Sequence, residues 1–362
     1  MASLSKRLGW GGPYLRLGLT LVVIAALGLG ITLGLGVLFP GFGRWAPGAE
    51  RVPAGVSVVI AGQVVDLGRC GRFEAVGLLE DLAQGLTVLP HDAYLDRATK
   101  GVVPALEGRR LDVAATVAAA VAAKSGETVA PVWAGLAPAV TLADFPEAPL
   151  YAGNPAKSQV AIILNVAWGD EFLDPICSLV EGAGGRLTIC PVGTWLEADP
   201  GHGAWLAAAV ARGHEAGNHG FYNQPMTYGD AAKAGEEIQR MAGLISRAGV
   251  KEAPFFAPPM GAFDQATLQA AAAAGYRTVL WSLDTIDWRL EGVDVIADRV
   301  IARVKAGDII LCHPTAQTAP AMAKFLPALQ AKGLKVVTLS ELLSPTLPTE
   351  DSGAGAPTAP PD

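Results

Sequence analysis

The sequence predicts an α/β protein, a distorted (β/α) barrel preceded by a transmembrane helix and a small α+β domain. Three observations support this class. Residues 17–39 form one long uncharged apolar run, residues 55–145 mix β-branched and helix-periodic segments, and residues 155–343 alternate short apolar runs with longer periodic ones. Strand-helix repeats with continuously apolar strands indicate a buried parallel sheet, and this many repeats indicate a barrel.

Composition limits the partners that the chain can have. The chain has 362 residues, a formal net charge of −7 at pH 7 and no visible basic patch. Nucleic acid is therefore not expected as a partner. The four cysteines, Cys70, Cys177, Cys190 and Cys312, show no CxxC spacing, so we expect small buried side chains rather than a zinc-thiolate site. The sequence alone leaves any disulfide pairing open.

The N-terminal apolar run predicts an uncleaved signal anchor. Three cations, Lys6, Arg7 and Arg16, precede residues 17–39. As a helix that run spans roughly 34 Å, enough to cross a bilayer, and it is longer than the roughly 7–15 apolar residues of a signal peptide. The positive flank predicts that residues 1–16 stay in the cytoplasm, so that the bulk of the chain lies outside the cell membrane, held by one helix.

A Gly- and Pro-rich linker, residues 40–54, leads into the small domain. There the sequence predicts a hairpin at residues 56–67, helices at residues 72–84 and 112–123, and a strand at residues 128–132. No cluster of His, Cys or carboxylate residues marks a site in this domain.

Two stretches of the small domain, residues 100–117 and 138–141, resemble a peptidoglycan-binding module of bacterial cell-surface proteins, which carries similar G…LD…T…A and P.VT segments. The resemblance implies a cell-wall glycan as a partner. The alternative is a plain α+β spacer domain.

The barrel region shows its strands and helices by their periodicity. Apolar runs predict strands at residues 160–165, 186–192, 214–218, 255–258, 277–281, 308–313 and 335–339. Helical spacing predicts helices at residues 172–182, 203–212, 230–248, 264–274, 293–305 and 319–331. A Pro/Ala-rich linker is expected over residues 146–154, and a disordered Pro-, Thr- and Ser-rich tail over residues 344–362.

Polar, ionisable and aromatic residues concentrate where the predicted strands end. In a (β/α) barrel, functional residues come from the carboxyl ends of the strands. The segments at these ends are residues 165–171, 219–223, 256–261, 281–288 and 311–315. Their convergence predicts a functional site at that end of the barrel.

The Gly-rich stretch that holds His214 and His219 is the first marker of this site. A histidine in such a loop, after a short strand, is placed to reach a metal or a substrate. The alternative for each is a buried structural histidine whose hydrogen bonds are satisfied within the fold.

The five segments, taken in order, resemble the five motifs of the polysaccharide deacetylases, the NodB homology domain of carbohydrate esterase family 4. The resemblance covers about residues 155–343 and is strongest to the membrane-anchored, sporulation-associated branch. It rests on Asn-Val-Ala-Trp-Gly from residue 165, Phe-Ala-Pro-Pro from residue 256 and Trp-Ser-Leu-Asp-Thr-Ile-Asp-Trp from residue 281.

The resemblance implies an N-deacetylase that acts on cell-wall or related N-acetylated glycan. In such an enzyme a divalent metal, usually zinc, polarises an acetamide carbonyl and activates a water. An Asp base takes the proton of the water, and a His acid protonates the leaving amine.

Several motif positions carry the residues that the family uses. The resemblance assigns His219 as the first metal histidine and His313 as the general acid. The fourth motif is present as Asp284, Asp287 and Trp288.

Four other positions differ from the family pattern. The metal Asp that follows the base has no direct counterpart, since Val166 or Ala167 stands there. Asn165 stands at the position of the base Asp, Asn223 at that of the second metal histidine, and Ala257 at that of the Arg that pairs with the base. An amide cannot accept a proton at neutral pH, and its oxygen is a poor zinc ligand beside imidazole. The joint loss of base and Arg is self-consistent, because an unpaired buried Arg would be costly.

Two hypotheses therefore remain. One is a working N-deacetylase with a rebuilt metal site, in which Asp170 or Glu171 joins His219 and Asn223 to hold zinc. The other is a catalytically inactive, membrane-tethered glycan-binding protein that kept the groove. In either case we expect substrate contacts from Trp168, Tyr222, Pro258, Pro259 and Trp288, and we expect Trp195 and Trp205 in the core.

Overall fold

The structure, a computed structural model, describes residues 50–347. Its internal contacts divide the described chain into two compact units. The first consists of residues 50–86 and 111–133, and the second consists of residues 87–110 and 134–347. Each unit is therefore built from two separate stretches of the chain.

The expected transmembrane helix, residues 17–39, lies outside the described residues, as does most of the expected tail. Within residues 50–347, no helix combines the length and the apolar character that crossing a bilayer requires.

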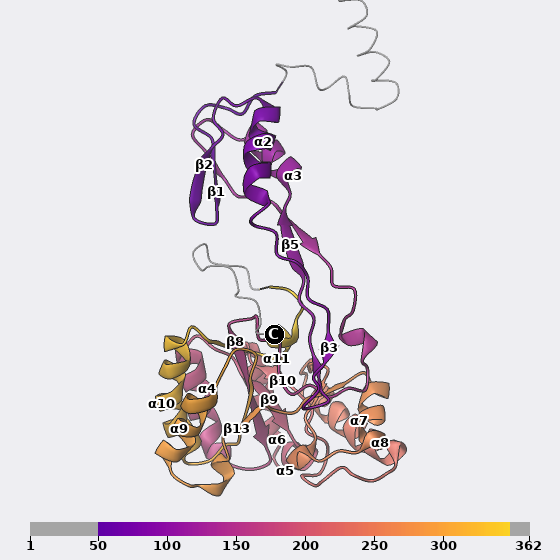
Figure 1. Ribbon diagram of the computed structural model, residues 1–362. Helices are drawn as coiled ribbons and strands as arrows, with labels where there is room; N and C mark the ends of the chain where they lie inside the picture. The colour runs from indigo at the N-terminus through magenta and orange to yellow at the C-terminus, as the bar shows by residue number, and fades with distance from the viewer. Residues whose placement is uncertain (1–49, 348–362) are drawn as a thin grey trace, which may run out of the picture. The chain divides into compact units, whose positions relative to one another are not determined.

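The first unit packs two helices against a small sheet (Figure 1). Strands β1 (Ser57–Ile60) and β2 (Gln63–Asp66) form the predicted antiparallel hairpin, and β6 (Thr128–Val129) pairs in parallel with β1. Helices α2 (Arg72–Ala83) and α3 (Val113–Ala122) share a core with β1, which confirms the predicted elements.

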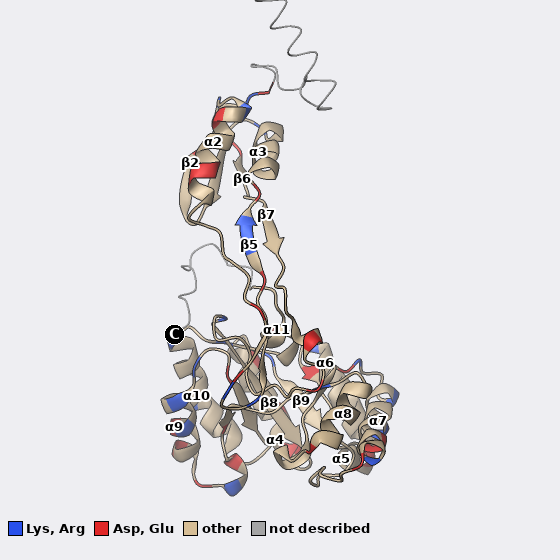
Figure 2. Cartoon of the chain, turned by 45° about the vertical axis from the view of Figure 1, so that its right-hand side comes forward, with Lys and Arg blue, Asp and Glu red and all other residues tan. Residues whose placement is uncertain are grey.

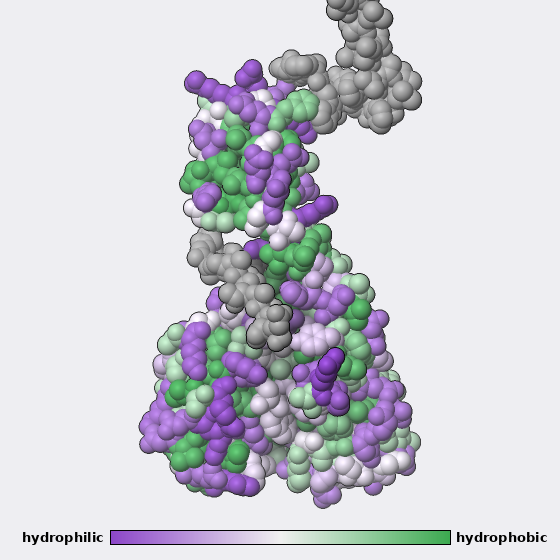
Figure 3. Space-filling view, in the orientation of Figure 1, coloured by the Kyte–Doolittle hydropathy of each residue, from purple (hydrophilic) through white to green (hydrophobic). Residues whose placement is uncertain are grey.

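Part of the apolar surface of the first unit remains exposed. Val64 on β2 is 70% exposed and Leu78 on α2 is 43% exposed. Figure 3 shows apolar side chains gathered over this part of the unit.

Helix α3 begins where the sequence predicts, because the Asp112 carboxylate accepts the N–H of Ala115 at 2.9 Å.

Short elements lead into the second unit. They are β3 (Tyr94–Leu95), β4 (Val102–Val103), β5 (Gly108–Leu111), β7 (Trp133–Leu136) and the 3₁₀ helix η2 (Leu142–Asp144). Strands β3 and β4 pair in antiparallel fashion, and β5 lies beside β7.

The small domain is smaller than we expected. We expected it to cover residues 55–145, whereas residues 87–110 and 134–145 group with the second unit. The Ala93 N–H donates to the Val140 carbonyl at 2.9 Å and so joins these two segments. Their extended stretches carry no helical periodicity, so the sequence does not show which core they join.

The segment just before the barrel is packed rather than free. We expected a linker over residues 146–154, but Leu150 is fully buried and forms a parallel bridge with Val279. The Val102 N–H also donates to the Pro149 carbonyl at 2.9 Å. A packed extended segment and a free linker can share the same Pro/Ala-rich composition, so composition could not distinguish them.

The second unit is built on a parallel sheet centred on β8 (Gln159–Val166). The strand order is β10-β9-β8-β14-β13, and β15 pairs with the first residues of β8. All of these ladders are parallel, as the strand-helix repeats predict. The remaining strands are β9 (Thr188–Pro191), β10 (Glu215–Ala216), β11 (Phe255–Phe256), β12 (Arg277–Thr278), β13 (Leu283–Asp284), β14 (Ile309–Cys312) and β15 (Lys335–Val337).

Further pairings carry the sheet toward a distorted barrel. Asn218, just after β10, forms a parallel bridge with Phe256 of β11, and β11 pairs with β12. Strands β12 and β13 lie on one extended run of chain, and β13 pairs with β14. Going from β10 through β11, β12 and β13, the chain therefore comes back to β14, which belongs to the same sheet as β10.

Helices cover the outside of this sheet (Figure 1). Helices α9, α10 and α4 are neighbours on one side, and α7 and α8 are neighbours on another. Figure 2 shows the charged residues on the outer helices, whereas β8 and β9 carry none. The helices are α4 (Asp170–Gly182), α5 (Gly193–Ala198), α6 (Pro200–Ala211), α7 (Ala231–Arg247), α8 (Gln265–Ala273), α9 (Val293–Arg303), α10 (Thr318–Ala331) and α11 (Leu339–Leu343), with 3₁₀ turns η3 (Pro259–Gly261) and η4 (Asp287–Arg289).

The core of the second unit confirms two side-chain expectations. Trp195 is 5% exposed, and Trp205 packs against the same core. Cysteines 177, 190 and 312 are fully buried, and all four cysteines of the chain are free thiols. Helix α5, which carries Trp195, was not predicted because six residues are too few to show a helical period.

Candidate active site

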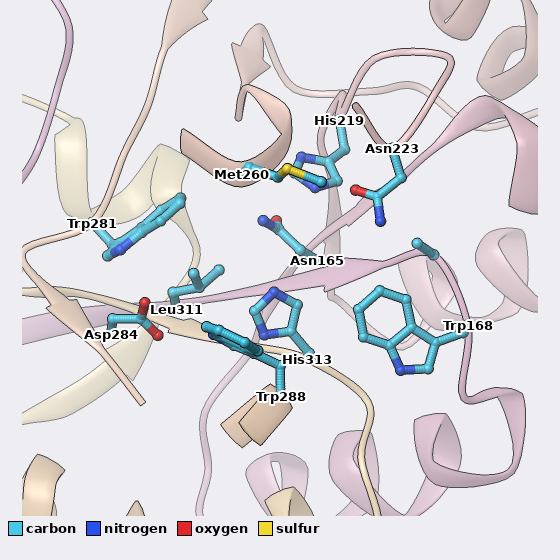
Figure 4. Close-up of a pocket in the computed structure, with 11 residues that line it drawn as sticks. Asn165, Trp168, His219, Asn223, Met260, Trp281, Asp284, Trp288, Leu311 and His313 are labelled. Carbon is cyan, nitrogen blue, oxygen red and sulfur yellow. The ribbon is translucent and has the colours of Figure 1, made fainter. Parts of the chain in front are cut away.

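A cavity of about 420 Å³ lies at the carboxyl ends of the barrel strands (Figure 4). It is of the size that small-molecule sites usually have. It draws residues from the ends of β8, β13 and β14 and from the loops after β10 and β11. The lining residues are Asn165, Ala167, Trp168, His219, Asn223, Met260, Trp281, Asp284, Trp288, Leu311 and His313.

His219 is held in place by the loop that follows β10. The Asn218 side chain donates to the Ile238 carbonyl at 3.0 Å and accepts the Gly220 N–H at 2.9 Å, which fixes the backbone on both sides of His219. The His219 Nδ1 lies 2.5 Å from the carbonyl oxygen of Ala257. Burial lowers the pKa of His219 to about 4, so the ring is neutral and Nε2 keeps its lone pair.

His313 is held by a fully buried carboxylate. Asp287 accepts the His313 Nδ1–H and the His313 backbone N–H, both at 2.8 Å, and the hydroxyl of Thr318 donates to the same carboxylate at 2.8 Å. Asp287 is 0% exposed. This network fixes the ring plane and the tautomer of His313, as a carboxylate does in acid-base pairs.

Trp168 forms one wall of the cavity through a stack on His313. The two ring centroids are 5.8 Å apart with an interplanar angle of 8°. The next residue, Gly169, has a φ of +81°, and a Cβ there would lie 2.1 Å from the Pro314 carbonyl oxygen. Only glycine allows the loop after β8 to approach the loop after β14 this closely.

Three non-glycine residues near the cavity adopt left-handed backbone conformations. Met260 has a φ of 59°, Ile286 of 55° and Leu290 of 55°. A β-branched residue such as Ile286 is uncommon in this region, and such strain concentrates at functional sites. The Ile286 conformation lets its N–H donate to the Asp284 carboxylate at 2.8 Å, which aims Asp284 at the cavity.

Asp284 lines the cavity as a half-buried carboxylate. Burial raises its pKa, and the hydrogen bond from Ile286 and the nearby His313 and Arg299 only partly oppose that rise. Relative to an exposed Asp its charged form is therefore less favoured, and a cation bound beside it would oppose this shift.

Asn165 ends β8 at the base of the cavity. It is 3% exposed, and its Oδ1 has no hydrogen-bond partner. The register that pairs it with Cys190 of β9 puts its side chain on the cavity side of the sheet. A buried acceptor without a partner is costly and is a marker of an unfilled polar site.

The divalent metal implied by the family resemblance does not fit these residues. Within residues 50–347, no three His, Cys, Asp or Glu side chains come close enough to hold one metal ion. His219 offers Nε2, but its cavity neighbours Asn165 and Asn223 are amides. Neutral amide oxygens are weak ligands for zinc.

The carboxylates that we expected to rebuild a metal site lie elsewhere. Asp170 accepts the Trp195 indole N–H at 2.6 Å and pairs with His202 at 2.9 Å. Glu171 is exposed on the first turn of α4, and neither residue lines the cavity. The helix that starts at residue 170 turns both carboxylates away from the strand end, which the sequence did not reveal.

The other expected contacts divide into two groups. Trp168 and Trp288 line the cavity and are 44% and 49% exposed. Tyr222 is also 44% exposed but is not among the lining residues, and Pro258 and Pro259 are buried in the turn that carries Met260.

His214 is a buried structural histidine whose hydrogen bonds are satisfied within the fold, which was the alternative to a site role. Its Nδ1 accepts the Leu187 N–H at 3.0 Å, so its Nε2–H donates to Glu181 at 2.8 Å. It lies outside the cavity lining, whereas His219 belongs to it.

Sequence reasoning missed four lining residues, Ala167, Met260, Trp281 and Leu311. All four lie inside the motif segments, so their positions along the chain were the available signal. Leu311 belongs to a fully buried strand, and neither its type nor its neighbours indicate that it faces a cavity.

Several known proteins are similar to this chain. A family model described as polysaccharide deacetylase matches residues 152–279. The chain is 33% identical over 217 residues to the uncharacterised protein YlxY of Bacillus subtilis, covering 59% of this chain and 66% of that protein. It is 39% identical over 140 residues to a peptidoglycan-N-acetylglucosamine deacetylase of Bacillus cereus, covering 37% of this chain and 65% of that enzyme. The chain thus spans just under two thirds of the length of these relatives.

Solved structures that are similar to this chain belong to the same family as the relatives found by sequence. A CE4 family pseudoenzyme from Bacillus anthracis matches with a TM-score of 0.66 and 28% identity, covering 75% of this chain and 95% of that one. A mutant of that pseudoenzyme with restored enzymatic activity matches with the same TM-score and 26% identity, covering 75% and 98%.

Proposed function

Because the chain belongs to the polysaccharide deacetylase family, we propose that it binds a cell-wall or related amino-sugar glycan in the cavity of Figure 4 and does not hydrolyse it. The glycan class is supported by the relatives, one of which is a peptidoglycan-N-acetylglucosamine deacetylase. The lack of hydrolysis is supported by the residues of this chain.

Asn165 is the observation that carries the proposal. It lines the cavity, the motif resemblance assigns it to the family's general-base position, and an amide has no proton-accepting pKa near neutrality. Asp287 cannot take over this role, because it is fully buried and both of its oxygens already accept hydrogen bonds from His313 or Thr318. The lack of a three-ligand metal site in residues 50–347 also supports a protein that does not hydrolyse the glycan.

The aromatic residues support binding. Trp168 and Trp288 are each close to half exposed at the cavity, and Trp281 also lines it. Exposed indole rings at the cavity suit the apolar faces of sugar rings. The protein would then hold a glycan without consuming it.

The test is calorimetric titration with amino-sugar oligomers and with soluble peptidoglycan fragments. We expect binding that falls about tenfold or more in Trp168→Ala, because stacking and His313 support are both lost. Tyr94→Ala is the matched control, since Tyr94 is a 51% exposed aromatic that does not line the cavity. No binding by the wild-type protein to any of these glycans would refute the proposal.

A second candidate is slow N-deacetylation. It is favoured by the intact His313–Asp287 pair and by Asp284, a carboxylate that lines the cavity. Acetate release from an N-acetylglucosamine oligomer separates the two candidates. Turnover by the wild-type protein that disappears in His313→Gln would support this second candidate.

We also propose that residues 17–39 tether the protein to the cell membrane with the glycan-binding unit outside. The support is the uncharged run after three cations. The resemblance of the small domain to a peptidoglycan-binding module fits the same location.

A further inference from the structure

We propose that the sugar recognised in this cavity carries a free amine, so that the protein prefers de-N-acetylated glycan to N-acetylated glycan. The inference rests on the proposed glycan-binding function and specifies the chemical class of its ligand. Its basis is the combination of acceptors, charge and ring faces that the cavity presents (Figure 4).

The two cavity histidines present acceptors. Each Nδ1 faces a group that can only accept a hydrogen bond: the Ala257 carbonyl for His219 and the Asp287 carboxylate for His313. Each Nδ1 must therefore carry a proton. Burial keeps the His219 ring neutral, so that its Nε2 is a lone-pair acceptor, and the neutral form of His313 would offer a second one.

Asn165 adds a buried acceptor that the protein leaves unsatisfied. It is 3% exposed, lines the cavity, and its Oδ1 has no partner. Such an atom gains most from a ligand that donates a hydrogen bond. An ammonium group donates three, whereas a secondary acetamide donates one and brings a carbonyl acceptor of its own.

The charge of the cavity is also suited to a cation. Of the eleven lining residues Asp284 is the carboxylate, and none is Lys or Arg. The nearby Arg299 donates to the Thr285 carbonyl and pairs with Glu291, and it does not line the cavity. A ligand ammonium would meet Asp284 without a competing Lys or Arg from the lining.

Ring faces complete the arrangement. Trp168, Trp281 and Trp288 line the same cavity; Trp168 stacks on His313, and the Arg289 guanidinium lies 4.9 Å from the centroid of Trp288, so Trp281 is the ring for which the structure records neither contact. Indole gives the strongest cation–π attraction of the aromatic side chains, and aromatic walls recognise ammonium groups in many proteins. The same faces stack on the carbon skeleton of a sugar.

A bare metal ion would not satisfy these acceptors, because no three His, Cys, Asp or Glu side chains in residues 50–347 approach closely enough to share one. The donors must be spread over a larger ligand. An amino sugar provides an ammonium and several hydroxyl groups on one rigid ring, which is the pattern that a cavity of about 420 Å³ can engage.

The experiment compares two tetrasaccharides by calorimetry, one of glucosamine and one of N-acetylglucosamine. It is run at an acidic pH at which the glucosamine amines are protonated, and at roughly 0.15 M salt to screen non-specific attraction. We expect the glucosamine tetramer to bind roughly tenfold more tightly. A parallel arm measures sedimentation with peptidoglycan before and after its treatment with a peptidoglycan-N-acetylglucosamine deacetylase, and we expect more binding afterwards.

Two variants test whether the preference for glucosamine comes from the cavity or from the net negative charge of the chain. Asp284→Asn keeps the oxygen that accepts the Ile286 N–H, and we expect it to lower the ratio of the two affinities from roughly tenfold to about one. Glu171→Gln removes an exposed carboxylate outside the cavity and should preserve the preference.

Equal or tighter binding of the N-acetylated tetramer would overturn this inference and leave the proposed glycan binding intact. A preference lost equally in both variants would also overturn it, because the attraction would then be general electrostatics. Failure of both tetramers and of peptidoglycan to bind would refute the proposed function itself.

Discussion

The His219 Nδ1 lies 2.5 Å from the carbonyl oxygen of Ala257, so the ring of this cavity histidine is oriented by the backbone of residue 257. A backbone carbonyl can orient the ring whatever side chain residue 257 carries. The orientation of His219 should therefore persist in variants of Asn165 and Asn223.

We predict that Asn165→Asp combined with Asn223→His creates zinc binding and raises acetate release. The change at residue 223 adds a second imidazole beside His219 and so strengthens zinc binding, and the change at residue 165 supplies the carboxylate that acts as the base. General base catalysis contributes about 10²–10⁴-fold, and we expect the low end, because Ala257 leaves the new Asp without an Arg to lower its pKa.

Zinc affinity by calorimetry and acetate release from an N-acetylglucosamine oligomer check this prediction. Asn223→His alone is the control, which should gain zinc affinity without activity. A wild-type protein that already binds zinc tightly and turns over as fast as the double variant would show that Asn165 and Asn223 are not the replaced positions.

We predict that Gly169→Ala destabilises the second unit and weakens glycan binding. Its φ of +81° disfavours a side chain, and the new Cβ would lie 2.1 Å from the Pro314 carbonyl oxygen. The two loops must separate, which disturbs the Trp168–His313 stack, and we expect a loss of about 1–3 kcal/mol in the free energy of unfolding.

Gly182→Ala is the matched control for Gly169→Ala. Gly182 lies in α4, and an added Cβ would meet no atom within 4 Å. Denaturant unfolding should show no loss of stability for this control. Equal behaviour of both variants would mean that the close approach of the two loops is not required.

We predict that Leu150→Ala costs the second unit roughly 2–5 kcal/mol of unfolding free energy, as large-to-small core changes do. Leu150 is fully buried and bridges to Val279. Leu89→Ala, at a site 69% exposed within the same unit, should cost far less. Equal losses would show that the segment before the barrel behaves as a linker after all.

We predict that acid weakens the fold through His214. Burial lowers its pKa, although the hydrogen bond and charge of Glu181 oppose that shift. Because the folded pKa is below the unfolded value of about 6.5, the unfolded state binds more protons between the two values. The contribution is therefore complete above about pH 6.5 and is lost as the pH falls toward the folded pKa.

Urea unfolding at about pH 5 and about pH 7 measures this loss. In His214→Asn, which keeps an acceptor for the Leu187 N–H, the difference between the two pH values should shrink. His91→Asn, at an exposed site, should leave the difference unchanged. An identical pH difference in His214→Asn and the wild-type protein would contradict the assignment.

We predict that deletion of residues 1–45 moves the protein from the membrane fraction to the soluble fraction without loss of the second unit's thermal transition. The only long uncharged apolar run of the sequence lies in that part. Fractionation of cells that express the full and shortened chains checks it. A full chain found in the soluble fraction would rule out the anchor.

The sequence predicted the strands and helices of the barrel because burial imposes period and apolarity on them, as in β8 and α7. It also identified which strand ends supply the cavity, since Asn165, His219, Asp284 and His313 sit in dense polar segments. The motif resemblance, not periodicity, supplied their roles.

The sequence could not show in which direction a side chain or a backbone segment points in the folded protein. Asp170 and Glu171 follow a strand end closely, yet the first turn of α4 carries them away from the cavity. Met260 reaches the cavity because of a left-handed backbone that its residue type does not favour. The extended residues 87–110 gave no periodic signal, so their place in the second unit became visible only in the structure.

Each unit is made of two stretches of chain that alternate along the sequence, so the first unit is complete before the second during synthesis. Residues 87–110 leave the ribosome early, but the Glu107 N–H bonds to the Pro345 carbonyl, which emerges almost last. The first unit needs residues only up to 133 and can fold while the barrel is still being made. Residues 87–110 can meanwhile pair with one another through β3 and β4, but their contact with Pro345 must await the last part of the chain.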